Sequence, residues 1–214
     1  MLGRDPQLAR ATGEYGKTGL HWAAEKDEVE IARLLLDAGA SIESTTEWGA
    51  TPLEWAAVMG STRVADLLLS RGAAGLTLVT AAALGKLDVV RAIVRGGDLA
   101  GQSRPASPTK DDEWPADAAC VQGDVLSDAM YSAARNGHDA VVAFLLDAGA
   151  CVDAKGFFGA TGLHWAAING HRTTVNLLLE RGASRTIRDA RFKATPDAWA
   201  EEGGHEDIAK GLRG

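Results

Sequence analysis

The sequence contains little proline, little cysteine and no long run of apolar residues. Among 214 residues there are only 6 prolines and 2 cysteines, against 25 glycines. Few prolines with many glycines favour short helices ended by glycine over a disordered or collagen-like chain. Cys120 and Cys151 have neither metal-ligand spacing nor the pattern of a disulfide framework, so we expect free thiols in a reducing cytoplasm. The absence of a long apolar segment or an apolar signal core argues against membrane insertion and secretion.

Positive charge is also scarce. Lysine and arginine total 22 against 29 aspartates and glutamates, which gives a net charge of -7 and an isoelectric point near 5.2. Phosphate binding needs a basic face, so we do not expect a nucleic acid as the main partner, although a basic patch can lie within an acidic total. Arginine outnumbers lysine, which favours a bacterial source.

What the sequence does contain is an internal repeat. Four stretches align: GKTGLHWAAEKDE from Gly16, GATPLEWAAVMGS from Gly49, GATGLHWAAINGH from Gly159 and KATPDAWAEEGGH from Lys193. Two weaker copies lie between the second and third of these stretches. The anchor positions of the six copies are Leu20, Leu53, Leu78, Met130, Leu163 and Asp197, at spacings of 33, 25, 52, 33 and 34 residues.

A period near 33 residues with T-P-L-H-x-A at its head resembles the ankyrin repeat family, and the resemblance covers nearly the whole chain. It implies a single all-α domain, a solenoid of about six helix–turn–helix repeats with short β-hairpin-like loops. The expected repeats are 16–48, 49–74, 75–98, 127–158, 159–192 and 193–214. A partial repeat over 2–15 precedes them, as if the chain began part-way through a unit, and one long insertion covers 97–127.

The residues of one unit explain why such repeats stack. Thr161 is placed to cap a short helix whose apolar side includes Leu163, and Gly170 ends that helix in a left-handed turn. A second helix around Leu178 follows and stops at Gly182. Neither helix buries its apolar side alone, so neighbouring units must cover each other.

Three departures from the repeat carry expectations of their own. No hairpin follows Ala73, which shortens one spacing to 25 residues. Asp197 and Glu201 replace apolar residues in the last copy, which predicts a polar cap. The insertion is either a solvated surface loop or a flap over the groove, and Trp114 is the reason to consider a flap, because a polar loop rarely keeps a tryptophan that packs nowhere.

The resemblance implies that the residue after the histidine of T-P-L-H faces a concave groove. In this sequence that position holds Trp22, Trp55, Thr80, Ser132, Trp165 and Trp199. Four indoles around two small hydroxyl residues predict a narrow groove that could bind a partner. The alternative is that the rings pack between helices as part of the core.

The hairpin tips carry a second aromatic row, which the resemblance places at the rim of the groove. Its members are Tyr15, Trp48, Phe158 and Phe192. Aromatic side chains exposed on a rigid frame dominate binding interfaces, so this row adds to the candidate binding surface.

The motif histidine is present as His21 and His164, and the resemblance implies that it bonds neighbouring backbone and holds the turns. Glu54 and Tyr131 take its place in two repeats. We also count Tyr131 among the groove residues.

Two interpretations of Glu54 remain open. Its carboxylate is either simply solvated or part of an aromatic cage with Trp22, Trp48 and Trp55. Such a cage suits a quaternary or methylated ammonium, and ankyrin domains of certain histone-lysine methyltransferases use one.

Signatures of catalysis and metal binding are absent. The sequence has no phosphate-binding loop, no G-x-S-x-G and no H-E-x-x-H. His138, His171 and His205 are separated by whole repeats, so we do not expect them to converge on a metal. We expect no cofactor and no enzymatic activity.

The sequence therefore favours a monomeric, cytoplasmic module that binds a protein partner through an aromatic-rich groove. The runner-up is a pocket for a small organic molecule in the gap between Thr80 and Ser132, under the insertion. An enzyme assembled from groove residues is a distant third.

Overall fold

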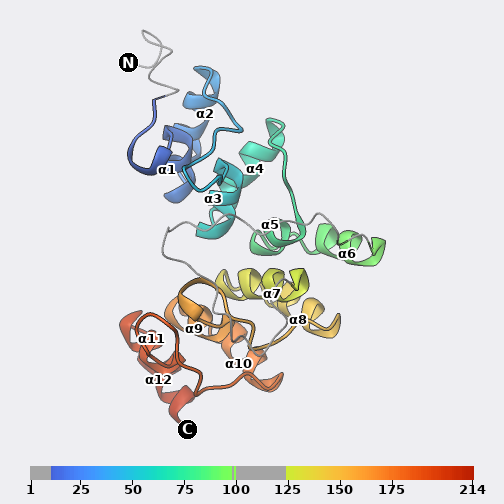
Figure 1. The fold of residues 1–214 in the computed structure, drawn as a ribbon, viewed down its shortest axis with the longest axis vertical. Helices are drawn as coiled ribbons and strands as arrows, with labels where there is room; N and C mark the ends of the chain where they lie inside the picture. Colours follow the sequence, from blue (N-terminus) through green and yellow to red (C-terminus); the bar gives the residue numbers. More distant parts are fainter. Residues whose placement is uncertain (1–10, 98, 100–123) are drawn as a thin grey trace. The chain divides into compact units, whose positions relative to one another are not determined.

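The computed structural model describes residues 11–97, 99 and 124–214. These residues form twelve α-helices, which follow one another as six pairs joined by short turns (Figure 1). The described part of the chain contains no strand, and isolated bridges such as Lys155–Thr161 mark its hairpin-like loops. The predicted all-α repeat fold is thereby confirmed.

The described residues fall into two compact units, divided between Leu76 and Thr77. The N-terminal unit contains α1 (Gly19–Glu25), α2 (Val29–Asp37), α3 (Pro52–Met59) and α4 (Thr62–Ser70). The C-terminal unit contains α5 (Leu78–Ala83), α6 (Leu87–Gly96), α7 (Val125–Arg135), α8 (Asp139–Asp147), α9 (Gly162–Ile168), α10 (Arg172–Glu180), α11 (Pro196–Glu202) and α12 (Glu206–Arg213). The division falls at the junction where the sequence lacks a hairpin.

The repeated apolar positions form the core of each unit. The anchor side chains of the first five repeats are at most 1% exposed; they are Leu20, Leu53, Leu78, Met130 and Leu163. The alanines that follow each anchor are also buried, which lets neighbouring helices approach closely. Burial of these apolar groups is the main stabilising contribution to the stack.

Threonine begins most of the first helices. Thr161 accepts a hydrogen bond from the third residue of α9, as the sequence predicts, and Thr51 does the same for α3. These caps satisfy backbone N–H groups that have no partner within the helix. The capping threonines therefore fix where each repeat turns from hairpin to helix.

A histidine at the turn between paired helices joins successive repeats of the C-terminal unit. His138 Nε2 lies 2.9 Å from the Ala83 carbonyl oxygen, which also accepts a hydrogen bond from Asn136 Nδ2 at 2.8 Å. The imidazole packs against Gly85, where a Cβ would come within 2.7 Å of the ring. Gly85 also has a φ of 69°, so glycine is required here on two grounds.

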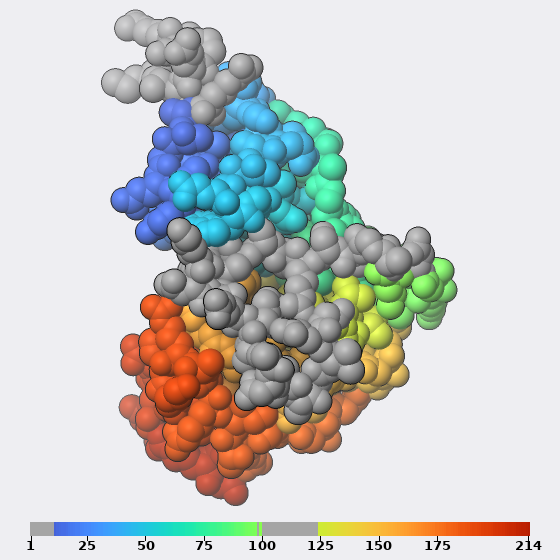
Figure 2. Space-filling view, viewed as in Figure 1, coloured from blue at the N-terminus to red at the C-terminus, as the bar shows by residue number. Residues whose placement is uncertain are grey.

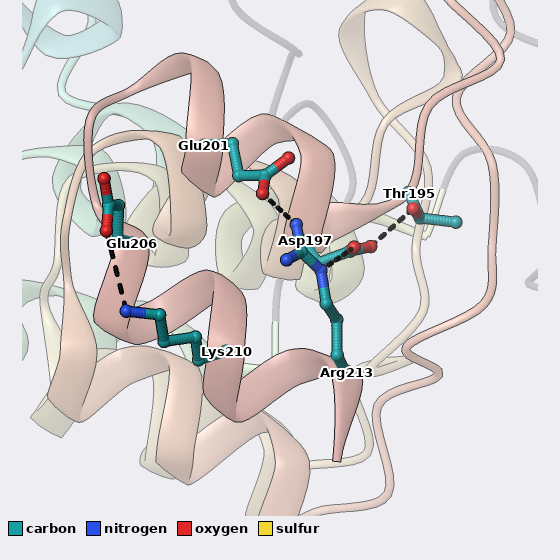
Figure 3. A network of polar contacts seen from close by, with 6 residues as sticks. All are labelled: Thr195, Asp197, Glu201, Glu206, Lys210 and Arg213. Atoms are coloured by element: carbon teal, nitrogen blue, oxygen red, sulfur yellow. Dashed lines mark hydrogen bonds and ion pairs between the residues drawn. The ribbon is translucent and has the colours of Figure 1, made fainter.

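Charged residues of the last repeat pair with each other, as Figure 3 shows. Arg213 of α12 binds Asp197 through Nε at 3.0 Å and contacts Glu201 as well, while Lys210 lies 3.5 Å from Glu206. These residues lie on the repeat coloured red at one end of the C-terminal unit (Figure 2). The polar character predicted for this end is present in α11 and α12.

Some expectations concern residues outside the described ranges. The partial repeat over 2–15 is described only from residue 11, and Trp114 and most of the insertion lie outside. Cys151 is disulfide-bonded, so the expectation of a free thiol is wrong there, while Cys120 lies outside the described residues. That correction removes the cysteine argument for a reducing compartment.

Candidate functional site

Two tryptophans of the N-terminal unit, Trp22 and Trp55, hold a cation that belongs to the chain itself. Lys17 directly precedes the capping threonine of α1, and its Nζ lies 4.5 Å from the ring centroid of Trp22 and 4.3 Å from that of Trp55. The same ammonium lies 2.8 Å from Glu25 Oε2. An ammonium between two indole faces is attracted by both ring quadrupoles, and the carboxylate balances its charge.

Both partners of this ion pair are mostly buried. The side chains of Lys17 and Glu25 are 12% and 18% exposed. Burial by itself would raise the pKa of Glu25, but the hydrogen bond and positive charge of Lys17 outweigh it and lower that pKa. Glu25 therefore remains ionised and keeps the ammonium over the rings.

Glu54 has a different role from the one expected in a cage. Its Oε2 accepts hydrogen bonds from Thr51 N at 2.8 Å and Thr51 Oγ1 at 3.3 Å, which closes the N-terminal cap of α3. The carboxylate beside the indoles is that of Glu25. Where the cage hypothesis places a foreign ammonium, the structure places Lys17.

The aromatic rim of the N-terminal unit stacks onto the same cluster. Trp48 lies between the rings of Tyr15 and Trp55, with centroid distances of 5.0 and 6.4 Å. Tyr15 is 53% exposed and Trp22 is 44% exposed, whereas Trp55 is only 3% exposed. Trp55 thus belongs to the core, and Tyr15 and Trp22 form the accessible part of the cluster.

The C-terminal unit repeats this arrangement with different cations. Trp165 packs edge-on against Trp199 at 5.0 Å and stacks with Phe158 at 6.3 Å. The guanidinium of Arg135, the last residue of α7, lies 4.0 Å from the Trp165 ring centroid. Arg191 lies 4.8 Å from the Phe158 centroid. Each tryptophan pair therefore has a cation over at least one of its rings.

Exposure differs widely among the aromatic residues of the C-terminal unit. Trp199 is 6% exposed, and its Nε1 donates a hydrogen bond to Asp189 Oδ2 at 3.1 Å. Trp165 and Phe158 are half-buried, and Phe192 is 61% exposed. Phe158 and Phe192, with ring centroids 5.9 Å apart, are the aromatic pair at the hairpin tips.

The residues expected to form a small-residue gap lie against the helix backbone. Thr80 is fully buried and its Oγ1 lies 3.0 Å from Thr77 Oγ1 in the cap of α5. Ser132 Oγ donates to the Asp128 carbonyl oxygen at 2.9 Å, and Tyr131 is 3% exposed. A cavity of about 340 Å³ does occur in the C-terminal unit, but it lies at the turn before α12 and none of the predicted residues lines it.

The motif histidines hold the turns, as predicted. His21 Nδ1 accepts from Thr18 N at 3.1 Å, so Nε2 carries the proton and donates to the Ala50 carbonyl oxygen at 2.9 Å. His164 makes the same two contacts with Thr161 and Ala194. Burial lowers the pKa of both imidazoles, that of His164 to about 4.

Sequence reasoning missed the charged side chains that contact the aromatic rings and their cations. Lys17, Glu25, Arg135 and Arg191 were not among the predicted residues. One signal existed: Glu25 and Arg135 occupy the same place in their repeats, five residues after the anchor, at the end of the first helix. Arg135, at that place, lies over Trp165 of the following repeat, and Glu25 binds the lysine that lies over Trp55.

Comparison with known families identifies the chain. The family described as ankyrin repeats (3 copies) matches residues 2–77, 78–189 and 130–213. The chain therefore belongs to the ankyrin repeat family, whose members generally bind other proteins and are generally not enzymes. No curated protein matches it significantly. Within the described residues no helix is long and apolar enough to span a membrane, and no three potential metal ligands cluster.

Proposed function

We propose that this chain is a non-catalytic module that binds a protein partner through the aromatic side chains of its hairpin tips and first helices. The observation that supports this most directly is the conformation of Tyr15 and Phe158. Both have left-handed backbone, with φ of 60° and 62°, and each precedes a glycine that is also left-handed. Such a turn favours asparagine before glycine, and a bulky side chain there is strained.

Because Tyr15 and Phe158 are unfavourable for the turn, a role other than stabilising the fold explains their presence. At the tip of each hairpin the ring is placed beside a second aromatic residue, Trp48 in one unit and Phe192 in the other. In each pair one ring is exposed, Tyr15 in the first and Phe192 in the second, and the other is half-buried. Aromatic side chains bury about 150–250 Å² each and lose little conformational entropy on binding, which makes them effective anchors for a partner.

Catalysis receives no support from the polar groups of the site. Both ring nitrogens of His164 are engaged by the backbone or cap of its own turn, and the carboxylate of Glu54 caps α3. A general base needs a nitrogen or oxygen that faces a substrate, and these groups face the protein backbone. The proposal is therefore one of recognition rather than turnover.

The proposal is tested by capture from an extract of the source organism, with the immobilised chain and a double variant, Tyr15→Asn/Phe158→Asn. Asparagine suits the turn, so the variant keeps the fold while it loses both rings. Leu34→Gln is the matched control, because Leu34 is 59% exposed and belongs to α2 and not to a hairpin. We expect a protein that the wild type and control retain and the double variant loses. Retention by all three, or no specific protein at all, contradicts the proposal.

A further inference from the structure

We propose that the hairpin over residues 185–194 of the C-terminal unit binds an acidic peptide segment of the partner. Arg188, Arg191 and Lys193 would supply the positive charge, and Phe192 the apolar contact. This inference rests on the proposed function and specifies the chemistry of the partner.

The hairpin over residues 185–194 carries a cluster of positive charges in a chain that is acidic overall. Four cationic side chains, Arg185, Arg188, Arg191 and Lys193, are exposed within nine residues of a protein whose net charge is -7. The one acidic residue of the segment, Asp189, is 1% exposed. Its carboxylate accepts hydrogen bonds from Phe192 N at 2.5 Å and Ala194 N at 2.9 Å. The negative charge is thus directed inward to hold the hairpin, and the positive charges face outward.

Arg191 is held in place without a carboxylate partner among the described residues. Its guanidinium lies 4.8 Å from the Phe158 centroid and 5.5 Å from that of Phe192. Stacking on a ring fixes the guanidinium while the N–H groups at its edge can still donate two hydrogen bonds to a carboxylate. Two other exposed arginines of this unit do have carboxylate partners: Arg172 lies 3.4 Å from Asp207, and Arg181 lies 2.7 Å from Asp147.

Lys193 occupies a position that glycine holds in other hairpins. It stands two residues before the capping threonine, where the hairpins before α1, α3 and α9 have Gly16, Gly49 and Gly159. All four residues are left-handed, and the φ of Lys193 is 56°. Lysine is less favourable than glycine in this conformation, so the fold alone does not account for the charge.

The charge distribution favours an acidic protein segment over a nucleic acid. The cluster covers one hairpin, and phosphate backbones are bound by longer basic faces on proteins that are basic overall. The corresponding hairpin over residues 41–50 of the N-terminal unit has Glu43 and Glu47 and no lysine or arginine. Positive charge is therefore a property of this hairpin and not of the repeat.

Fluorescence anisotropy with the full chain tests the inference. The probe is a labelled peptide, Glu-Glu-Phe-Glu-Glu, and its neutral match is Gln-Gln-Phe-Gln-Gln. We expect the acidic peptide to bind at least about ten-fold more tightly than the neutral one, and more weakly as salt is added. Arg191→Ala should weaken binding about five-fold, whereas Arg172→Ala, at the opposite end of α10, should leave it unchanged.

Lys193→Gly removes one positive charge without an expected loss of stability. This variant should unfold no earlier than the wild type and bind the acidic peptide about three-fold more weakly. Equal binding of the two peptides, equal effects of the two arginine substitutions, or tighter binding of an oligodeoxythymidylate would overturn the inference. Capture from extract reports any partner, while the peptide reports only charge, so the two proposals fail separately.

Discussion

The same six residues, GLHWAA, begin the first helix of a repeat in each unit, at Gly19–Ala24 and Gly162–Ala167. The histidine behaves identically in both, with one nitrogen on the capping threonine and the other on the next hairpin. The tryptophan does not. Trp22 is 44% exposed and covers Lys17, whereas Trp165 is half-buried between Phe158 and Trp199.

The difference comes from neighbours outside the motif. Where the first copy has Lys17, the second has Ala160, so no cation is present at the equivalent position of the hairpin. The charge over Trp165 comes instead from Arg135, one repeat earlier. The motif therefore determines the turn and the cap, and adjacent repeats determine what the tryptophan contacts. Four predictions examine how far this holds, from the largest effect to the smallest.

The anchor leucines should be equivalent in the two copies. Leu20 and Leu163 are both fully buried, so Leu20→Ala and Leu163→Ala should each lower the free energy of unfolding by about 2–5 kcal/mol through the cavity left behind. Urea unfolding of each variant measures this. A change below about 0.5 kcal/mol in either would show that the two motif copies are not packed alike.

The buried histidine should make the C-terminal unit sensitive to acid. The pKa of His164 is lowered from 6.5 to about 4 by burial, so the unfolded chain binds the proton more tightly than the folded one. The contribution of the neutral imidazole to the free energy of unfolding is complete above pH 6.5. It decreases by about 3 kcal/mol as the pH falls toward 4.

His164→Gln provides the comparison, because glutamine can still cap the helix but does not titrate. Urea unfolding at pH 7 and pH 4.5 should show a smaller loss of stability in the variant than in the wild type. Equal losses would mean that other groups account for the acid sensitivity.

The ammonium between the indoles should stabilise the N-terminal unit. Lys17→Met keeps the apolar stem but removes the charge and leaves Glu25 without its main partner, at an expected cost of about 1–2 kcal/mol. Lys26→Met is the control, since Lys26 is 66% exposed and lies 3.5 Å from the same carboxylate; it should cost less than about 0.5 kcal/mol. The pKa of Glu25, followed by NMR titration, should rise more in Lys17→Met than in Lys26→Met, because Lys17 lowers it more. Matching results for the two lysines would refute the buried ion pair.

The smallest effect concerns the strained tips. Tyr15→Asn and Phe158→Asn should each leave stability unchanged or raise it by up to about 1 kcal/mol, because asparagine adopts the left-handed conformation more readily. Thermal unfolding measures the change. Clear destabilisation by both would show that the rings support the fold, and would weaken their assignment to a partner.

The fold was largely predictable because the residues that determine the structure of each repeat lie within that repeat. The capping threonine, the motif histidine, the anchor leucine and the glycine after the helix lie within about one helix length of each other, and each acts through local backbone geometry. The missing hairpin after Ala73 also marked the place where the described chain divides into two units.

The candidate site was predictable only in part, because burial depends on the neighbouring repeat. Trp22 and Trp55 occupy the same position of the repeat, yet one is 44% exposed and the other 3%. Thr80, at the same position again, is fully buried in its own cap. A repeat position fixes the backbone, but part of what covers a side chain comes from the neighbouring repeat, as Arg135 does for Trp165 and Lys17 does for Trp55.

The most direct test of the account is the affinity of the captured partner for the wild type and for Tyr15→Asn/Phe158→Asn, measured by isothermal titration calorimetry beside thermal unfolding of both proteins. We predict that the double variant binds at least about ten-fold more weakly while it unfolds at the same or a higher temperature. Unchanged affinity in a variant that remains folded would contradict recognition through the aromatic tips.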